Sequence, residues 1–337
     1  MISDQIEEFF PGIYRILIPL AGNPLKELNS YVIKGNSESN NLLIDTGFQT
    51  KECYQCMVES LDKLGISMDN TDILLTHLHA DHSGNAAALI KENNKVYLSS
   101  LDTEVLLSHS RSLPGGEGGM YEYQRNRLIR NQISPLLVDK MLENSTSYKV
   151  NPDYSFTNYT KLEEGNIIEA GDYKLEAIYT CGHTPGHMCF NVQGTGIMFL
   201  GDHVLFGITP NITNWPGVED SLGDYLKSLD KISKYDVSIP LPGHRQTGDF
   251  YERIERLKAH HEKRLNECLN IVGNSKGAKL YDIAGNMKWK IRAASWEDFP
   301  PLQKWFALGE CLSHIDLLKK QGRIKECGTD KIWYELS

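Results

Sequence analysis

Residues 72–82 read Asp-Ile-Leu-Leu-Thr-His-Leu-His-Ala-Asp-His, and the rest of the fold can be worked out from them. The apolar beginning is typical of a short buried strand. His77 and His79 are separated by one residue, so an extended backbone points both imidazoles to the same side, where one metal ion can take both. Asp81 and His82 follow where the chain turns toward a helix, and a second ion can take these two.

Three further segments place a residue of a metal-ligand type at the end of a predicted strand, beside a glycine or proline that turns the chain. These residues are His183, Asp202 and His244. Five of the 11 histidines are therefore candidate ligands. We expect His187 and His203 to lie beside the metals without binding them. The remaining histidines, which we expect to be solvated or structural, are His109, His260, His261 and His314.

The elements along the chain alternate between strands and helices. Strands are predicted at 13–18, 29–34, 42–44, 72–76, 96–98, 166–180, 188–193, 196–200 and 237–240. Helices are predicted at 51–65, 85–92, about 120–142 and 223–234. The order predicts an α/β protein in which the segment 103–160 is a helical insertion. A glycine run at 114–119 inside it predicts a loop.

The 337 residues exceed the usual size of one domain, and 40% hydrophobic and 23% charged residues are typical of a globular protein. We expect a large domain at 1–248 and a smaller one at 249–337. No apolar run reaches the ~20 residues that span a bilayer, and the acidic N-terminus does not resemble a signal peptide. A cytoplasmic location without membrane contact is the expectation. Cys53 and Cys56 form a Cys-x-x-Cys pair that we interpret as structural. The sequence does not determine the oligomeric state.

The histidine cluster, followed in order by His183, Asp202 and His244, resembles the metallo-β-lactamase superfamily. Within it, the sequence looks most like the branch of glyoxalase II and β-lactamase-like protein 2. Supporting motifs are Ile-Asp-Thr-Gly at 44–47 and His-Thr-Pro-Gly-His at 183–187. The resemblance covers about 13–248. It implies an αββα sandwich, in which two sheets lie between two helical layers.

The resemblance also implies a ligand set for two divalent ions. His77, His79 and His183 hold the first ion in this scheme. The second ion is held by Asp81, His82 and His244. Asp202 bridges both ions, and Asp45 orients a ligand by hydrogen bonding. Zinc is the expected metal, while iron and manganese suit the same ligands. Arg245 departs from relatives that often have glycine after the last histidine.

The C-terminal part extends the resemblance to a winged-helix domain. A helix with apolar spacing at Leu308, Leu312, Ile315 and Leu318 precedes a predicted hairpin after Gly322. Residues 249–337 carry 16 Lys and Arg against 13 Asp and Glu, whereas the whole chain has a net charge of −9. The charges are mixed and form no dense basic run. A packing module is therefore favoured over a nucleic-acid-binding one.

The expected reaction is hydrolysis by a hydroxide that bridges the two metals, with Asp81 and Asp202 as catalytic proton carriers. A small-molecule ester, thioester or lactone is the expected substrate class. The alternative is a phosphodiesterase or endoribonuclease. In the insertion, Tyr121, Tyr123 and Arg125 are candidate substrate contacts or else ordinary surface residues of a helix.

Other classes of metal protein fit the sequence less well. A flavodiiron-type redox enzyme usually has Glu at the position of His79, together with a flavin domain. A mononuclear iron persulfide dioxygenase uses only the first histidine group, and here the second group is complete. A non-catalytic binding protein needs no complete ligand set.

Overall fold

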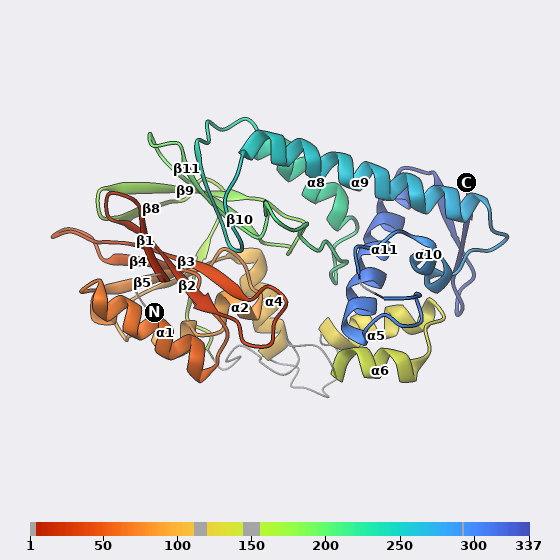
Figure 1. Cartoon of the computed structure of the whole chain (residues 1–337), viewed down its shortest axis with the longest axis horizontal. Helices are drawn as coiled ribbons and strands as arrows, with labels where there is room; N and C mark the ends of the chain where they lie inside the picture. Colours follow the sequence, from red (N-terminus) through yellow and green to blue (C-terminus); the bar gives the residue numbers. More distant parts are fainter. Residues whose placement is uncertain (1–4, 111–119, 144–155, 292) are drawn as a thin grey trace.

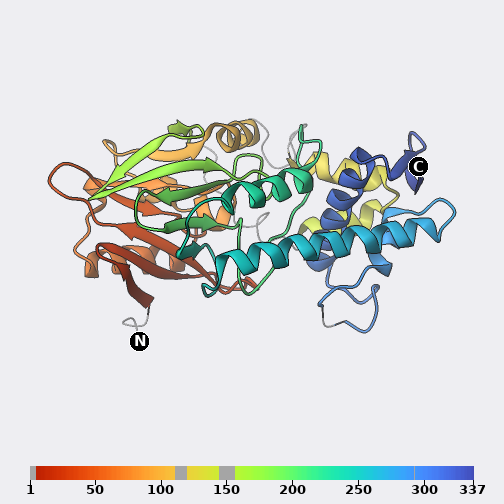
Figure 2. The same cartoon turned by 90° about the horizontal axis from the view of Figure 1, so that it is seen from above.

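The structure of the chain is a computed structural model that describes residues 5–110, 120–143, 156–291 and 293–337. The predicted glycine loop at 114–119 lies outside these ranges. A sandwich of strands and helices occupies one end of the molecule, and a cluster of helices with a hairpin occupies the other (Figure 1). The long helix α9 (Phe250–Gly273) runs from the first part to the second (Figure 2).

Two sheets form the sandwich. The first contains, in spatial order, β1 (Ile6–Phe10), β2 (Ile13–Pro19), β3 (Glu27–Ile33), β4 (Asn41–Ile44), β5 (Thr71–Leu74), β6 (Val96–Ser99) and β7 (Tyr159–Leu162). Its strands are antiparallel from β1 to β4 and parallel from β4 to β7. The second contains β12 (Ile239–Pro242), β11 (Ile197–Gly201), β10 (Met188–Val192), β9 (Tyr173–Tyr179) and β8 (Ile167–Ala170). It is antiparallel except for the pair β11–β12.

The side chains of a strand alternate between the two faces of each sheet. In β4, Leu42 and Ile44 enter the cluster between the sheets, whereas Leu43 packs on the outer side. In β11, Phe199 lies between the sheets and Leu200 faces the helices beyond the second sheet. Both sheets are thus apolar on both faces, as a covered sandwich requires. The layering of the predicted αββα sandwich is confirmed by these three clusters.

Short and long helices cover the two outer faces. The first sheet packs on α1 (Lys51–Lys63), α2 (Ala80–Ser83), α3 (Ala86–Leu89) and α4 (Ser100–Ser110). The second sheet packs on α8 (Ser221–Ile232) and the beginning of α9. The helix predicted at 85–92 ends earlier, at Leu89, because Ile90 is extended and an Asn-Asn turn follows. Cys53 and Cys56 are free thiols that face main-chain carbonyls of β2, in agreement with a structural role.

The C-terminal region consists of α10 (Leu280–Asn286), α11 (Pro301–Lys320) and a hairpin of β13 (Ile324–Cys327) and β14 (Trp333–Leu336), together with the end of α9. The predicted hairpin after a helix is present, and the four apolar residues with helical spacing in α11 are buried. The boundary at 248/249 and the winged-helix identity remain predictions. None of the described helices combines the length and the apolar character that crossing a bilayer requires.

The inserted helices α5 (Met120–Arg130) and α6 (Pro135–Glu143) pack against the C-terminal region, beside α11 (Figure 1). Tyr334 donates its hydroxyl to Asn131 Oδ1 at 2.6 Å, and Gln132 donates to the carbonyl of Ile332 at 2.8 Å. Arg127 forms an ion pair with Asp316 of α11. The insertion and the C-terminal helices therefore share one apolar core.

Candidate metal centre

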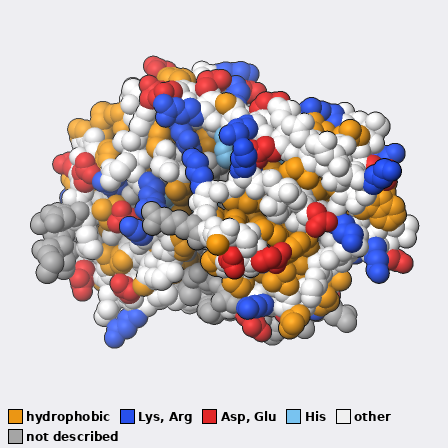
Figure 3. Space-filling view, turned by 45° about the vertical axis from the view of Figure 1, so that its right-hand side comes forward, with side chains coloured by type: hydrophobic (Ala, Val, Ile, Leu, Met, Phe, Trp, Pro, Cys, Tyr) orange, Lys and Arg blue, Asp and Glu red, His pale blue; other side chains and the backbone are white. Residues whose placement is uncertain are grey.

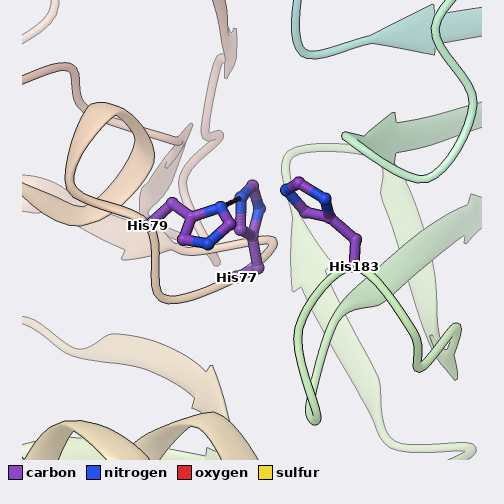
Figure 4. Close-up of side chains that lie close together, drawn as sticks. All are labelled: His77, His79 and His183. Atoms are coloured by element: carbon purple, nitrogen blue, oxygen red, sulfur yellow. Dashed lines mark hydrogen bonds between the residues drawn. The ribbon is translucent and has the colours of Figure 1, made fainter. Parts of the chain in front are cut away.

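The first group of candidate ligands comes from both sheets. His77 and His79 lie in the loop between β5 and α2, and His183 lies in the loop between β9 and β10. Their three rings converge on one point (Figure 4). His77 Nε2 lies 3.1 Å from His79 Nδ1, and one ring nitrogen of each histidine falls within a 4.8 Å group. The structure thus brings together three imidazoles that are up to 106 residues apart in the sequence.

The second group lies next to the first. Asp81 and His82 belong to α2, while His244 follows β12. The Nε2 atoms of His82 and His244 are 3.3 Å apart, and His244 Nε2 is 3.4 Å from Asp81 Oδ2. His82 and His244 are fully buried, whereas 14% of the Asp81 side chain is exposed. Asp81 therefore lies on the side of this group that faces solvent.

Asp202 lies between the two groups, at the end of β11. Its Oδ2 is 3.6 Å from His183 Nε2, and its Oδ1 is 3.5 Å from His82 Nε2 and 3.6 Å from His244 Nε2. Gly201, just before Asp202, lies in the left-handed region at φ 47°. A Cβ at this position would lie 2.7 Å from His187 Nε2 and 2.8 Å from Thr76 Cβ, so glycine is required for both reasons. With one oxygen near each group, this carboxylate is placed so that it could contact two cations.

Asp45 orients two of the histidines from behind. Its Oδ2 is 2.7 Å from His82 Nδ1 and accepts the hydroxyl of Thr76 at 2.8 Å. The single hydroxyl proton of Thr76 is used in its hydrogen bond to Asp45. His77 Nδ1, which is 3.0 Å from Thr76 Oγ1, therefore has to be the donor in the bond between these two atoms. Asp45 has φ 60°, in the left-handed region that aspartate tolerates better than most residues. Asp45 thus contacts His82 directly and His77 through Thr76.

The hydrogen bonds of the histidines fix which ring nitrogen carries a proton. His183 Nδ1 donates to the carbonyl of Asn211 at 2.9 Å, and His244 Nδ1 donates to the carbonyl of Glu27 at 2.7 Å. With the donations by His77 and His82, four Nε2 atoms point inward, and each carries a lone pair when its ring is neutral. His183 Nε2 and Asp202 Oδ1 are buried and have no hydrogen-bond partner among the described residues.

At separations of 3.1–3.6 Å, inward nitrogen and oxygen atoms repel one another unless a proton or a metal cation lies between them. Imidazole nitrogens and carboxylate oxygens are also the donor set that zinc and related ions prefer. The donation of each outer ring nitrogen to a carboxylate, hydroxyl or carbonyl is the usual support of a metal-bound histidine. The residues present therefore fit divalent metal ions.

The two groups differ in their electrostatics. Burial, together with neighbouring imidazoles, lowers the pKa of His77 well below its usual value and that of His79 to about 3. Burial also acts to lower the pKa of His82, but Asp45 and Asp202 outweigh it and hold this pKa well above its usual value. The pKa of His244 is raised in the same way by Asp202 and Asp81, against burial. The second group therefore binds protons more strongly than the first.

His187 and His203 lie beside the centre, as the sequence indicates. His187 Nε2 accepts the main-chain N–H of Asp202 at 3.1 Å, and its Nδ1 is 2.7 Å from the Thr180 hydroxyl. His203 packs between the rings of His187 and Tyr225. His187 thus holds the main chain that carries Asp202, and neither ring belongs to the three groups of candidate ligands.

Arg245 adopts φ 67°, a conformation that usually favours glycine. Its carbonyl accepts from Asn29 Nδ2 at 2.8 Å, and its guanidinium donates to the carbonyl of Pro24 at 2.8 Å. These contacts hold the arginine in the loop shape that a glycine at this position would allow. The departure from the family pattern therefore leaves the loop after His244 intact.

The candidate substrate contacts in the insertion are only partly described. Arg125 forms an ion pair with Asp139 at 2.7 Å, and the Tyr123 hydroxyl accepts from Arg127 at 3.2 Å. The side chain of Tyr121 and residues 111–119 lie outside the described part of the chain. Arg125 and Tyr123 thus have partners of their own within or next to α5.

Asp102, in the first turn of α4, connects the two loops that carry the first histidine group. Its Oδ2 accepts from the main-chain N–H of Leu78 at 2.9 Å and from the Thr184 hydroxyl at 2.7 Å. Its Oδ1 accepts from the N–H of Gly186 at 2.6 Å. Burial raises the pKa of Asp102 to about 6, so its carboxylate is mostly ionised at pH 7. Asp102 could not be predicted as a site residue from the sequence, because a lone aspartate at a helix start is a common surface feature.

Replacement of Asp102 by asparagine is expected to lower the free energy of unfolding by about 1–3 kcal/mol. Both oxygens of Asp102 accept from buried donors, so in either orientation the asparagine places its NH₂ group where an acceptor is needed. At least one buried donor then has no acceptor. Urea unfolding at pH 7 measures the change. Asp62→Asn, on the exposed side of α1, is the matched control and is expected to change little. An Asp102→Asn protein as stable as the Asp62→Asn protein contradicts the role given to Asp102.

Comparison with known proteins places the chain in a family. The sequence model of the Metallo-beta-lactamase superfamily matches residues 27–244. The Lactamase-like protein nscB of Aspergillus fumigatus is 25% identical over 266 residues, which cover 77% of this chain and 61% of that protein. An atrochrysone carboxyl ACP thioesterase of Aspergillus fumigatus is 28% identical over 293 residues, which cover 81% and 72%. The chain therefore spans less than two thirds of the first relative.

Solved structures resemble the whole described fold. A metallo-beta-lactamase family protein from Thermus thermophilus has a TM-score of 0.79 at 25% identity, over 98% of this chain and 100% of that chain. A beta-lactamase domain protein from Burkholderia ambifaria has a TM-score of 0.76 at 21% identity, over 98% and 95%. Since both likenesses cover nearly all of this chain, they include the C-terminal helices as well as the sandwich.

Proposed function

Because the chain belongs to the metallo-β-lactamase superfamily, we propose that it is a binuclear metal-dependent hydrolase whose preferred substrates are thioesters. The observation that carries the proposal is the convergence of three inward-facing Nε2 atoms on both oxygens of Asp202. We also propose that the chain is most like the branch of glyoxalase II and β-lactamase-like protein 2, that its C-terminal region is a winged-helix domain, and that it is cytoplasmic. Zinc is the proposed metal, and iron and manganese suit the same donors.

The ligand assignment follows the two groups. His77, His79 and His183 are proposed to hold one ion, and Asp81, His82 and His244 a second. Asp202 is proposed to contact both, and Asp45 to keep His82 and, through Thr76, His77 in place. This assignment leaves no inward-facing lone pair of the seven ligand side chains without a partner of opposite charge.

When bound, such ions polarise a carbonyl oxygen and lower the pKa of water toward ~7. The side chains around them move and hold protons. The carboxyl of Asp81 has a pKa of about 2: its burial acts to raise it, but its contact with His244 and the neighbouring imidazoles outweigh this effect. Asp81 is therefore ionised at neutral pH and, being on the solvent side, is the proposed acceptor of the proton of the attacking water.

A thioester suits this arrangement better than an ester with an alcohol leaving group. A thiol has a pKa near ~8.5, so it departs as a thiolate with little need for an acid. Asp81 and Asp202 are ionised and cannot supply a proton at the start of the reaction, because the pKa of each is lowered. The named thioesterases among the relatives support the same substrate class. Esters and lactones are the neighbouring classes.

A phosphodiesterase or ribonuclease remains the second candidate, since the C-terminal region resembles a winged helix. Some of the described cations of that region are paired with acidic side chains: Lys319 contacts Glu326, and Lys325 contacts Glu335 at 3.5 Å. In Figure 3, which turns this side forward, lysine and arginine side chains lie among acidic and hydrophobic ones. A phosphate backbone needs a more continuous basic surface, so the thioester proposal stands first.

We expect metal-quantified protein to hydrolyse an acyl thioester with a higher kcat/KM than the matched oxygen ester, lactone, phosphodiester or RNA. Thiol release, followed with a chromogenic disulfide, measures the reaction. Turnover of RNA or the phosphodiester alone supports the second candidate. One iron per chain together with oxygen uptake contradicts hydrolysis altogether.

A further inference from the structure

The C-terminal helices reach the metal centre through one segment, residues 204–215, which begins two residues after Asp202. Near its C-terminal end, this segment forms two hydrogen bonds with His183, one to the ring and one to the main chain. The carbonyl of Asn211 accepts from His183 Nδ1 at 2.9 Å, and Trp215 Nε1 donates to the carbonyl of His183 at 3.1 Å. The Trp215 indole also stacks on the His79 ring, with centroids 5.9 Å apart. The segment thus fixes the orientation of one proposed ligand and contacts another.

Helix α11 holds the part of the segment that contacts His183. Ser313, which is 1% exposed, donates its hydroxyl to the carbonyl of Ile212 at 2.7 Å. Gly309, one helical turn earlier, lies so close to the segment that a Cβ would be 2.6 Å from Thr213 Oγ1. Asn211 Nδ2 donates to the carbonyl of Phe306 at 3.4 Å. Three successive turns of α11 therefore contact three successive residues of the segment.

Helix α9 holds the beginning of the same segment. Arg253 donates Nε to the carbonyl of Leu205 at 2.6 Å and a terminal nitrogen to the carbonyl of Ile208 at 2.7 Å. Burial lowers the pKa of Arg253, which still remains a cation at neutral pH. Both carbonyls accept from one planar guanidinium, so their separation is fixed by its geometry. The segment is therefore held at both ends by helices that follow the sandwich in the sequence.

We propose that α9 and α11 are positioning elements of the metal centre: Arg253 and Ser313 hold residues 204–215 so that the Asn211 carbonyl aims His183 at the first ion. This inference rests on the proposed function, because it takes His183 as a metal ligand. It gives the C-terminal region a task in the chemistry beyond packing. A carbonyl that supports a metal-bound histidine determines both the orientation of the ring and the basicity of the ligand nitrogen.

The test measures metal binding by the full-length protein, not turnover. Ser313→Ala and Arg253→Met remove the contacts of α11 and α9. Thr71→Val is the matched control, because Thr71 is fully buried and its hydroxyl donates to the Ser67 carbonyl at 2.7 Å, at the opposite end of β5 from His77. Zinc affinity is determined by competition with a chromogenic chelator, at a temperature at which circular dichroism shows every variant folded. Cobalt-substituted protein reports the ligand geometry through its visible absorption.

We expect Ser313→Ala and Arg253→Met each to weaken zinc binding by about tenfold and to change the cobalt spectrum, as loss of support for a ligand does. Thr71→Val is expected to keep the wild-type affinity and spectrum. Wild-type affinity and spectrum in all variants overturn the inference and leave the metal centre standing. Equal weakening in all three variants also overturns it, because the cause is then general stability. A wild-type protein that binds no zinc, cobalt, iron or manganese overturns the proposed function itself.

Discussion

Asp202→Ala protein is expected to lose at least about 10³-fold in kcat/KM on a thioester, which corresponds to about 4 kcal/mol of transition-state stabilisation. Asp202 has one oxygen near His183 and the other near His82 and His244, so its removal takes a ligand from both proposed ions. It also removes the negative charge that offsets two cations in a buried site. Metal content is expected to fall together with activity.

Two further variants separate the carboxylate from nearby changes. Asp202→Asn keeps the shape and removes the charge, and it is expected to lose most of the activity as well. Asp236→Ala, at an exposed position before β12, is expected to behave as the wild type. Kinetics should be measured after metal analysis of each protein. Full activity of metal-replete Asp202→Ala protein would exclude Asp202 from the centre.

Acid is expected to strip the metal from the protein in two stages. A protonated imidazole cannot bind a metal ion, so protons compete with the metal for each histidine. His82 and His244 have raised pKa values, and protons therefore compete there at a higher pH. The pKa of His79 is about 3, so competition at the first group begins only in much stronger acid. As the pH falls, the ion of the second group should leave first.

Dialysis at stepwise lower pH, followed by metal analysis and return to pH 7, measures these stages. Complete removal is expected to abolish activity and to destabilise the fold by about 4 kcal/mol for each ion, relative to protein with free metal about 1,000-fold above the Kd of that ion. Thermal unfolding of the apo and metal-loaded forms gives this difference. Loss of both ions at the same pH contradicts the different electrostatics of the two groups, and equal unfolding temperatures contradict the metal centre.

The elements of the sandwich could be predicted because their sequence patterns are local. An apolar run followed by a glycine, a proline or a histidine cluster indicates a strand end, and candidate ligands such as Asp202 and His244 stand there. The structure brings all seven predicted ligands into adjoining groups. Which of them share an ion came from the resemblance to a family, since spacing along the sequence does not report distance in space.

The supports of the centre could not be predicted, because they depend on contacts between distant segments. Asp102 joins two loops through three donors, yet its sequence neighbours are those of an ordinary helix start. The Asn211 carbonyl that accepts from His183 is a main-chain atom and leaves no trace in the side chains. The packing of α5 and α6 on α11 likewise could not be predicted. The apolar face of each helix indicates that it is buried but not against which other helix.

The two sheets are joined next to His244 by a contact that closes a very long loop. Asn29 of β3 donates its side-chain amide to the carbonyl of Pro242, 213 residues later, and its main-chain N–H to that of Gly243. Closing so long a loop costs conformational entropy, which the contacts between the two sheets have to outweigh. On a ribosome, the chain has the first five candidate ligands outside the exit tunnel long before residue 244 emerges. Since Arg253 and Ser313, the proposed supports of His183, follow residue 244 in the sequence, the full set of ligands and supports exists only once nearly the whole chain has been synthesised.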